Sequence, residues 1–249
     1  MLRTPSAVTR VTCRRKLRKT GHGERKYTGA VPADLIHLVR HGEVHNPDGV
    51  LYGRIPGYRL SELGHRMAAS AVTALAGHTI TRLYASPLQR AQESAQPWAN
   101  GFGLPIHTDE RLIEPANKFE GRKFQFGPQV LSRPQSWPWI VNPMRPSWGE
   151  PFVSIASRML AVVEDAWRST ESGEVVLVSH QLPIWMVHRS IAGKRLYHDP
   201  RRRRCSLSSI TTFALREPVG ADVAPTFAEV GYQDPARELL EASVDFGAV

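Results

Sequence analysis

The sequence predicts an α/β protein built on a mostly parallel sheet that is flanked by helices on both faces. Short, continuously apolar segments alternate with longer segments of helical periodicity, which is typical of parallel strands that are buried on both sides. The chain has 249 residues, of which 41% are hydrophobic and 22% are charged, as in an ordinary globular domain. Its longest apolar runs fall far short of the ~20 residues that cross a membrane.

The first strand and helix follow from local sequence signals. Residues 35–39 form an apolar run that predicts a buried strand, and this run leads directly into Arg40 and His41. Ser61 is a suitable N-cap for a helix that continues to about Ala76.

A second strand and helix are expected immediately afterwards. The strand is short, at residues 83–85. Ser86 as N-cap and Pro87 in the first helical position then predict a helix as far as Asn100. A brief strand is expected at 106–107.

The second half of the chain repeats the pattern after an irregular segment. Helices are expected at 151–172 and 182–191, because apolar residues recur there at helical spacing. Buried strands are expected at 175–179 and 207–215.

Residues 115–151 contain seven prolines and three of the six tryptophans, at positions 137, 139 and 148. This density of proline argues against a regular helix. A long connection of this kind is typical of an active-site cover. A satellite hydrophobic cluster on the edge of the sheet stays open as the alternative.

The net charge of +9 is concentrated at one end of the chain. Residues 1–30 contain nine Lys or Arg and one acidic residue, Glu24, whereas the rest of the chain is nearly neutral. We therefore predict a disordered basic extension at 1–32, a domain at 33–216 and a C-terminal tail at 217–249. A contact of the extension with nucleic acid or anionic lipid stays open; otherwise neither nucleic acid nor membrane is an expected partner.

The cysteine content and the basic N-terminal segment bear on cellular location. Two cysteines, Cys13 and Cys205, cannot build a disulfide framework. The basic segment lacks the apolar run of a secretory signal, although its arginine content has some character of a mitochondrial transit peptide. A cytoplasmic protein is expected.

Three strand ends carry residues suited to binding phosphate. Arg40 and His41 follow the first strand, Ser86 and Arg90 follow the second, and His180 follows residues 175–179. Ligands of open α/β sheets bind beyond the carboxyl ends of the strands. Arginine binds phosphate oxygens bidentately, and helix N-termini attract anions. Together these residues predict a phosphate site.

The chain resembles the histidine phosphatase superfamily, also called the phosphoglycerate mutase-like family, over about residues 34–215. The matching segments are LVRHGE at 38–43, LSELG at 60–64, ASPLQRAQESA at 85–95, LIE at 112–114, EG at 120–121, GE at 149–150 before Arg158, and VSH at 178–180. The resemblance implies a phosphoglycerate mutase-like fold and a small phosphorylated metabolite as substrate.

The resemblance also implies a role for each site residue. His41 matches the nucleophile that becomes phosphohistidine, and the flanking arginines are expected to keep it neutral. Arg40, Arg90 and His180 match the groups that hold the phosphate. Glu114 matches the proton donor, whose pKa a bound phosphate can raise.

Two further phosphate contacts are predicted with less support from the motif. Asn46 is one residue closer to Arg40 than the family pattern has it. Gln181 stands after His180 where the family usually has glycine.

No cofactor or metal is expected. His41 and His45 are four residues apart, but Gly42 and the Asn46-Pro47 turn exclude the helix that a zinc motif of this spacing requires. The four arginines at 201–204 are expected to form a solvated surface, although a role near an anionic substrate stays open.

The residues after Glu114 bear on the type of reaction. Phosphoglycerate mutases have an Arg and an aromatic–Gly segment there, whereas this chain has Pro115-Ala116-Asn117-Lys118. The missing clamp favours a metal-independent phosphomonoester phosphatase. A mutase-type phosphoryl transferase and a non-catalytic phospholigand-binding protein stay open as alternatives.

Overall fold

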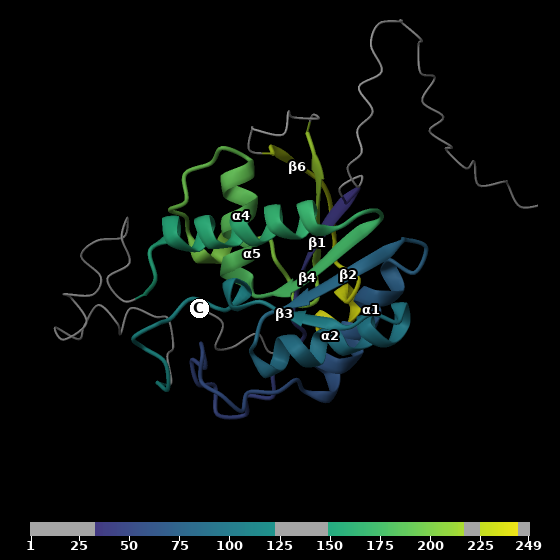
Figure 1. Cartoon of the computed structure of the whole chain (residues 1–249). Coiled ribbons are helices and arrows are strands. Elements are labelled where there is room, and N and C mark those ends of the chain that lie inside the picture. Colours follow the sequence, from purple (N-terminus) through teal and green to yellow (C-terminus); the bar gives the residue numbers. More distant parts are fainter. Residues whose placement is uncertain (1–32, 123–148, 217–224, 244–249) are drawn as a thin grey trace, which may run out of the picture.

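The strands of the protein form one mixed sheet (Figure 1). The computed structural model describes residues 33–122, 149–216 and 225–243. Within these residues the strands are β1 (Leu35–Arg40), β2 (Ile80–Ala85), β3 (Ile106–Thr108), β4 (Glu174–Ser179), β5 (Ile210–Leu215) and β6 (Phe227–Gln233). Their order is β3-β2-β4-β1-β5-β6; the first four strands are parallel to one another, β5 is antiparallel to β1, and β6 is antiparallel to β5. The prediction of a mostly parallel sheet is confirmed.

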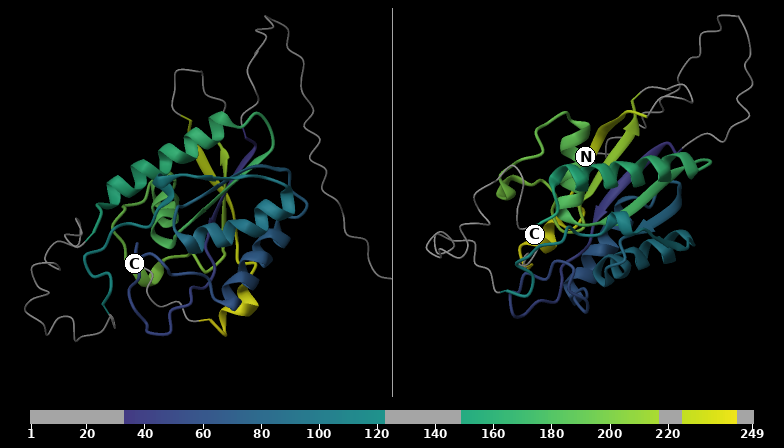
Figure 2. Two further views of the ribbon diagram at one scale, coloured as in Figure 1. Left: turned by 60° about the horizontal axis from the view of Figure 1, so that its bottom comes forward. Right: turned by 60° about the vertical axis from the view of Figure 1, so that its left-hand side comes forward.

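Helices cover both faces of the sheet, as predicted. The described helices are α1 (Glu62–Ala74), α2 (Gln89–Phe102), α4 (Phe152–Ser169), α5 (Gln181–Ile191) and the short α6 (Arg237–Leu240), with 3-10 turns η1 (Glu110–Leu112) and η4 (Pro200–Arg202). Helices α1 and α2 lie on one side, and α4 and α5 lie on the other (Figures 1 and 2).

The two faces have separate cores because successive side chains of a strand point in opposite directions. Val175 and Leu177 of β4 pack with α4 and α5. Val176 and Val178 pack with α1 and α2. This double burial explains why the strand reads as a continuous apolar run.

The helix starts were predicted with unequal success. Ser61 caps α1 as expected, and its Oγ accepts a hydrogen bond from the backbone N–H of Gly64 at 2.9 Å. The predicted start of the second helix at Ser86 and Pro87 is wrong, because α2 begins at Gln89 after an extended Leu88. The hydroxyl of Ser86 instead contacts the ring of His180.

The C-terminal part of the chain is more than the predicted tail. Strand β6 pairs antiparallel with β5 and extends the edge of the sheet. Leu239 and Leu240 of α6 pack with Met67 of α1. Periodicity did not reveal β6, because its side chains are mostly partly buried or exposed and so lack an apolar pattern.

Several sequence predictions fall outside the described residues. These include the basic extension at 1–32 and most of the predicted cover, with all three of its tryptophans. Both ends of the 115–151 segment are described, and Asn117 and Gly149 form an antiparallel bridge there. The two ends therefore lie together, next to Glu114.

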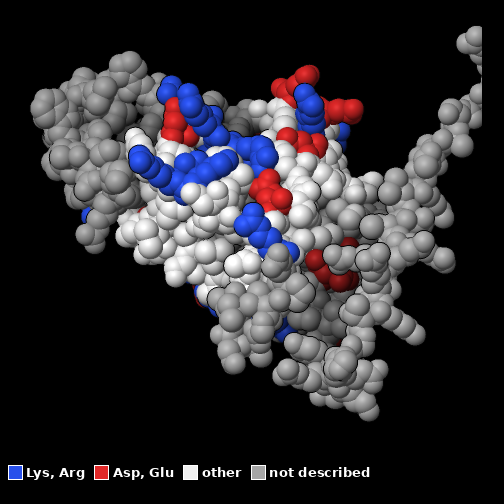
Figure 3. Space-filling model, turned by 90° about the horizontal axis from the view of Figure 1, so that it is seen from above, with Lys and Arg blue, Asp and Glu red and all other residues white. Residues whose placement is uncertain are grey.

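The surface carries mixed charge on the face seen from above. Basic side chains gather across part of this face, with acidic ones beside them (Figure 3). None of the helices in the described part of the chain is both long and apolar enough to cross a bilayer.

Candidate active site

The carboxyl ends of β1, β2 and β4 meet at one edge of the sheet, and the predicted phosphate-binding residues gather there. Arg40 ends β1 and His41 follows it, while His180 follows β4. Arg90 is the second residue of α2, and Glu114 lies two residues beyond η1. Each of these five side chains is at most 2% exposed. The fold therefore assembles a buried site from four separate parts of the sequence.

His41 is held as a neutral imidazole with one nitrogen available for reaction. Its Nδ1–H donates a hydrogen bond to the carbonyl oxygen of Gly42 at 2.7 Å, which leaves the lone pair on Nε2. The Nε–H of Arg90 points to that Nε2 at 3.4 Å. Burial lowers the pKa of His41 well below its ordinary value, and Arg90 and Arg40 lower it further. Burial, rather than the arginines named in the sequence analysis, is the larger cause.

His180 stands beside His41, with their ring centroids 5.1 Å apart. Its Nε2 shares a hydrogen bond of 2.7 Å with the hydroxyl of Ser86, and its Nδ1 lies 3.5 Å from Oε2 of Glu114. Burial, followed by the charge of Arg90, lowers the pKa of His180 well below its ordinary value. Ser86 thus orients the second histidine, a role hidden by the resemblance of Ser-Pro to a helix start.

Glu114 is a buried carboxyl group whose pKa lies close to neutral pH. Burial raises its pKa to about 7, while Arg90 and Arg203 oppose this rise. Its Oε1 has no hydrogen-bond partner among the described residues. Ser179 Oγ donates to the carbonyl oxygen of Leu112 at 2.7 Å, which fixes the turn before Glu114 to the end of β4. The pKa is therefore raised by the protein itself, without the bound phosphate that the sequence analysis invoked.

Backbone carbonyl groups orient the two buried arginines. One terminal nitrogen of Arg40 donates to the carbonyl oxygen of Cys205 at 2.8 Å. Arg90 donates to the carbonyl oxygen of Gly53 at 2.8 Å, and its guanidinium lies 4.7 Å from the ring centroid of Tyr52. Burial lowers the pKa of Arg90, and the charge of Arg40 adds to this effect. Two guanidinium groups held together in a buried site favour an anion between them.

The phosphate contacts of Asn46 and Gln181 both stay predictions. Both amide atoms of Asn46 hold the backbone of Val50, at 2.9 and 3.0 Å, so its part in phosphate binding stays a prediction. Gln181 begins α5 beside His180, and its Oε1 accepts a hydrogen bond from Arg203 at 3.2 Å.

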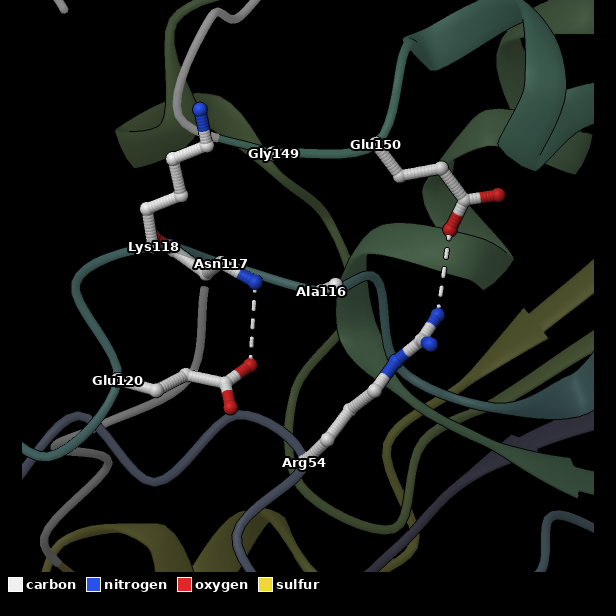
Figure 4. Close-up of a pocket in the computed structure, with 7 residues that line it drawn as sticks. All are labelled: Arg54, Ala116, Asn117, Lys118, Glu120, Gly149 and Glu150. Atoms are coloured by element: carbon white, nitrogen blue, oxygen red, sulfur yellow. Dashed lines mark hydrogen bonds and ion pairs between the residues drawn. The ribbon is translucent and has the colours of Figure 1, made fainter.

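A cavity of about 580 Å³ is lined by residues that follow Glu114 in the chain, beginning with Ala116 and Asn117 (Figure 4). Lys118 and Glu120 line it, together with Arg54 and Glu150, which point toward each other with a nitrogen–oxygen distance of 3.4 Å. Arg54 Nε–H also donates to the carbonyl oxygen of Glu114 at 2.5 Å. Sequence reasoning missed Arg54, which stands in a loop without a motif of its own.

An ion-pair network supports this cavity from the side of α4. Arg158 binds both carboxylate oxygens of Glu150, at 2.9 and 3.0 Å, and donates to the carbonyl oxygen of Arg111. This network connects α4 with the turn that precedes Glu114.

Within the described part of the chain, two groups of side chains could each offer three donor atoms to a metal ion. One is His41, Glu114 and His180, and the other is His37, His78 and Glu174; in each group the donors lie within 4.8 Å of one another. Arg40 and Arg90 stand next to the first group, and their charges oppose a divalent cation there.

Comparison with known proteins shows the family of the chain. A model of the histidine phosphatase superfamily (branch 1) matches residues 36–219. The chain belongs to this superfamily. It is 52% identical over 177 residues to the uncharacterized protein Rv0525 of Mycobacterium tuberculosis (strain ATCC 25618 / H37Rv), covering 71% of this chain and 88% of that protein.

More distant members of the superfamily carry activity names. The probable phosphoglycerate mutase GpmB of Yersinia pestis (strain Pestoides F) is 26% identical over 187 residues, covering 70% of this chain and 83% of that protein. The structure of the mycobacterial glucosyl-3-phosphoglycerate phosphatase Rv2419c has a TM-score of 0.64 and 22% identity, covering 79% of this chain and 96% of that chain. This structural similarity supports the predicted phosphoglycerate mutase-like fold.

Proposed function

We propose that the protein is a phosphomonoester phosphatase that acts through a phosphohistidine at His41 and needs no metal ion. The observation that carries this proposal is the state of His41. Its Nδ1 is fixed by Gly42, its Nε2 carries the lone pair, and its pKa is lowered well below the ordinary value. A neutral imidazole of this kind can act as a nucleophile at neutral pH.

The first step transfers the phosphoryl group to the enzyme. Nε2 of His41 attacks phosphorus, and the bond between phosphorus and the ester oxygen breaks. Arg40, Arg90 and His180 stabilise the charge on the phosphoryl oxygens. Glu114 gives its proton to the departing oxygen, which leaves as an alcohol, and Glu114 becomes a carboxylate.

The second step returns the enzyme to its starting state. Glu114 as a carboxylate removes a proton from a water molecule, whose oxygen attacks phosphorus. The bond between phosphorus and Nε2 breaks, and inorganic phosphate is released. His41 is neutral again and Glu114 is protonated again, so a pKa of about 7 suits both steps.

The cavity lined by residues that follow Glu114 can receive the organic part of the substrate. Arg54 lines that cavity and donates to the backbone carbonyl oxygen of Glu114, so the cavity borders the segment that carries the proposed proton donor. A substrate of the size of a small metabolite agrees with its volume of about 580 Å³.

A mutase is the second candidate, because relatives such as GpmB carry that name. A mutase must retain its product until the phosphoryl group returns. The residues after Glu114, Pro115-Ala116-Asn117-Lys118, lack the clamp of the phosphoglycerate mutases, which favours hydrolysis. A non-catalytic phospholigand-binding protein is the least favoured alternative, since the full set of reactive residues is present.

The test is capture of the phosphoenzyme. Brief incubation with ³²P-labelled phosphomonoesters, followed by quenching without acid, should label the protein at an acid-labile and base-stable bond. His41→Ala should abolish both label and turnover, whereas His65→Ala, at an exposed histidine, should keep them. EDTA should leave turnover intact, and a requirement for added zinc or magnesium would refute the metal-free mechanism. Release of phosphate from 3-phosphoglycerate, rather than formation of 2-phosphoglycerate, separates phosphatase from mutase.

A further inference from the structure

Three side chains with metal-binding donor atoms meet at the end of β4 that lies away from the candidate active site. Glu174 is the first residue of β4 and Ser179 is the last, so the strand separates Glu174 from His180 by about 20 Å. His37 lies within β1, and His78 lies between α1 and β2. Donor atoms of His37, His78 and Glu174 lie within 4.8 Å of one another. The proposed reaction uses none of these three residues.

Both imidazole rings direct a nitrogen at the same carboxylate oxygen. Nε2 of His37 lies 2.9 Å from Oε2 of Glu174, and Nδ1 of His78 lies 2.8 Å from that oxygen. Zinc bonds to nitrogen and oxygen ligands are about 2.0–2.2 Å long, which places the donor atoms of a tetrahedral site about 3.4 Å apart. A shift of about half an ångström at each contact would therefore admit the ion.

Thr212 supplies the supporting hydrogen bond that is typical of a histidine ligand. Nδ1 of His37 lies 2.9 Å from Oγ1 of Thr212, the residue that pairs with His37 between β1 and β5. A hydroxyl oxygen can accept from Nδ1–H, and the lone pair of His37 is then on Nε2, which faces Glu174. Histidine ligands are usually oriented by a partner on their second ring nitrogen. The sheet thus provides this partner for His37.

The backbone of the other two residues is also held in place. The N–H of Glu174 donates to the carbonyl oxygen of Thr79 at 2.8 Å, and Glu174 also pairs with Ile80 of β2. The N–H of His78 donates to the carbonyl oxygen of Leu75 at 2.9 Å. Ligands on rigid elements need little reorganisation when the metal binds.

The surroundings suit a divalent cation with one position open to water. His37 is 1% exposed, whereas the side chains of His78 and Glu174 are 36% and 14% exposed. Burial lowers the pKa of His37, and the carboxylate of Glu174 opposes this lowering. At His41, burial is followed by the charge of Arg90, which lowers the pKa further. A cation is therefore attracted by a carboxylate at His37 and repelled by a guanidinium at His41.

We propose that His37, His78 and Glu174 form a zinc site that stabilises the fold without taking part in turnover. Nε2 of His37, Nδ1 of His78 and Oε2 of Glu174 supply three ligands, and a water molecule supplies the fourth. The ion joins β1 and β4 to the segment before β2, so it binds the folded chain in preference to the unfolded one. The site is independent of the phosphatase mechanism proposed above.

The first test is the effect of zinc on stability. After treatment with EDTA and its removal, zinc at a hundred times its Kd should raise the thermal unfolding midpoint by roughly 5–10 °C at pH 7.5. Calorimetric titration supplies the Kd. Magnesium, which prefers oxygen ligands, should give no comparable shift. A midpoint that zinc does not raise would overturn the proposal.

Variants locate the ion. The zinc-dependent shift should be lost in His78→Gln and Glu174→Gln, and kept in His65→Gln, at an exposed histidine of α1. Each shift compares one protein with and without zinc, so a variant that is itself less stable still gives a result. The shift should also persist in His41→Ala, which lacks one member of the other donor group. Loss of the shift in His41→Ala, or an unchanged shift in His78→Gln, would place the zinc elsewhere and overturn the proposal.

Cobalt(II) and turnover test the geometry and the role of the site. Cobalt(II) can replace zinc in tetrahedral sites, and it absorbs visible light far more strongly there than in octahedral ones. The wild type should show this absorption and His78→Gln should not; its absence from the wild type would overturn the tetrahedral site. Both proteins should turn over substrate equally below their unfolding midpoints, because about 20 Å separates the ion from His180. Loss of turnover in folded His78→Gln would overturn the purely stabilising role.

Discussion

Oε2 of Glu114 lies 3.5 Å from Nδ1 of His180, and both side chains are buried. Burial raises the pKa of Glu114 to about 7 and lowers the pKa of His180. The two groups therefore do not form an ordinary ion pair below neutral pH, because the carboxyl group keeps the proton and the imidazole stays neutral. This division of protons is the one that the proposed role of Glu114 as proton donor requires.

Glu114→Gln should slow alkyl phosphates far more than p-nitrophenyl phosphate. General acid catalysis contributes about 10²- to 10⁴-fold, and a good leaving group needs little of it. Steady-state kcat values on both substrates check this prediction. Equal losses on the two substrates would assign the acid role to another group, with Glu43 as the next candidate.

Glu114→Gln should also change how stability depends on pH. The pKa of Glu114 is about 7 in the folded protein, against an ordinary value of 4.5, so the folded state binds this proton more tightly. The resulting stability is present below pH 4.5 and is lost as the pH rises through 7, at a cost of about 3 kcal/mol. The Glu114→Gln variant has no carboxyl group at this position, so it does not lose this stability as the pH rises.

Urea unfolding at pH 4.5, 6 and 8 tests the direction of this pH dependence of stability. The free energy of unfolding of Glu114→Gln relative to the wild type should increase by about 3 kcal/mol between pH 4.5 and pH 8. If the free energy of unfolding changes with pH in parallel for the two proteins, burial does not raise the pKa of Glu114.

Ser86→Ala should lower kcat about tenfold by removing the 2.7 Å contact to Nε2 of His180. Ser86 is a positioning residue, so the free energy of unfolding should fall by only about 1 kcal/mol. Ser70→Ala, at a partly exposed serine of α1 far from the site in the sequence, is the control. A loss of activity that follows the loss of stability, or a change in KM alone, would contradict the positioning role.

Gly64→Ala should destabilise the protein by about 2 kcal/mol or more. A Cβ at this position would lie 2.1 Å from the carbonyl oxygen of Glu43, and the backbone must move to avoid it. Gly77→Ala meets nothing within 4 Å and should be nearly neutral. Similar unfolding midpoints in urea for both variants would show that the loop after β1 yields easily.

Removal of residues 1–32 should leave turnover and the unfolding midpoint nearly unchanged. Most of the net positive charge lies in this segment, and none of the reactive residues does. The truncation should also remove any salt-sensitive binding to DNA. Aggregation or loss of activity would show that the segment packs on the rest of the protein.

The sequence was informative where a residue's role follows from its position at a strand end. Arg40, His41 and His180 come directly after continuous apolar runs, and parallel strands bring such positions to one edge. Arg90 could be named from its place just after the second strand, whereas Glu114 could be named only through the resemblance, because it lies beyond a turn whose direction a sequence does not state.

Other features depend on contacts between distant segments. Ser86 has the sequence context of a helix cap, and only the approach of β4 directs its hydroxyl to His180. Arg203 is one of four consecutive arginines, and His198 and Gln181 determine that it alone turns inward. Strand β6 lies at the edge of the sheet, where little apolar pattern is required.

The burial of Arg40 and Arg90 in one site links the folding of the protein to its own product. Like charges placed together in the interior lower the free energy of unfolding, and a bound phosphate offsets part of that cost. Inorganic phosphate at a hundred times its Kd would add about 2.7 kcal/mol to stability. In the proposed reaction the same groups bind the phosphoryl group of the substrate and the phosphate released, so we expect product accumulation to protect the protein from unfolding while it slows turnover.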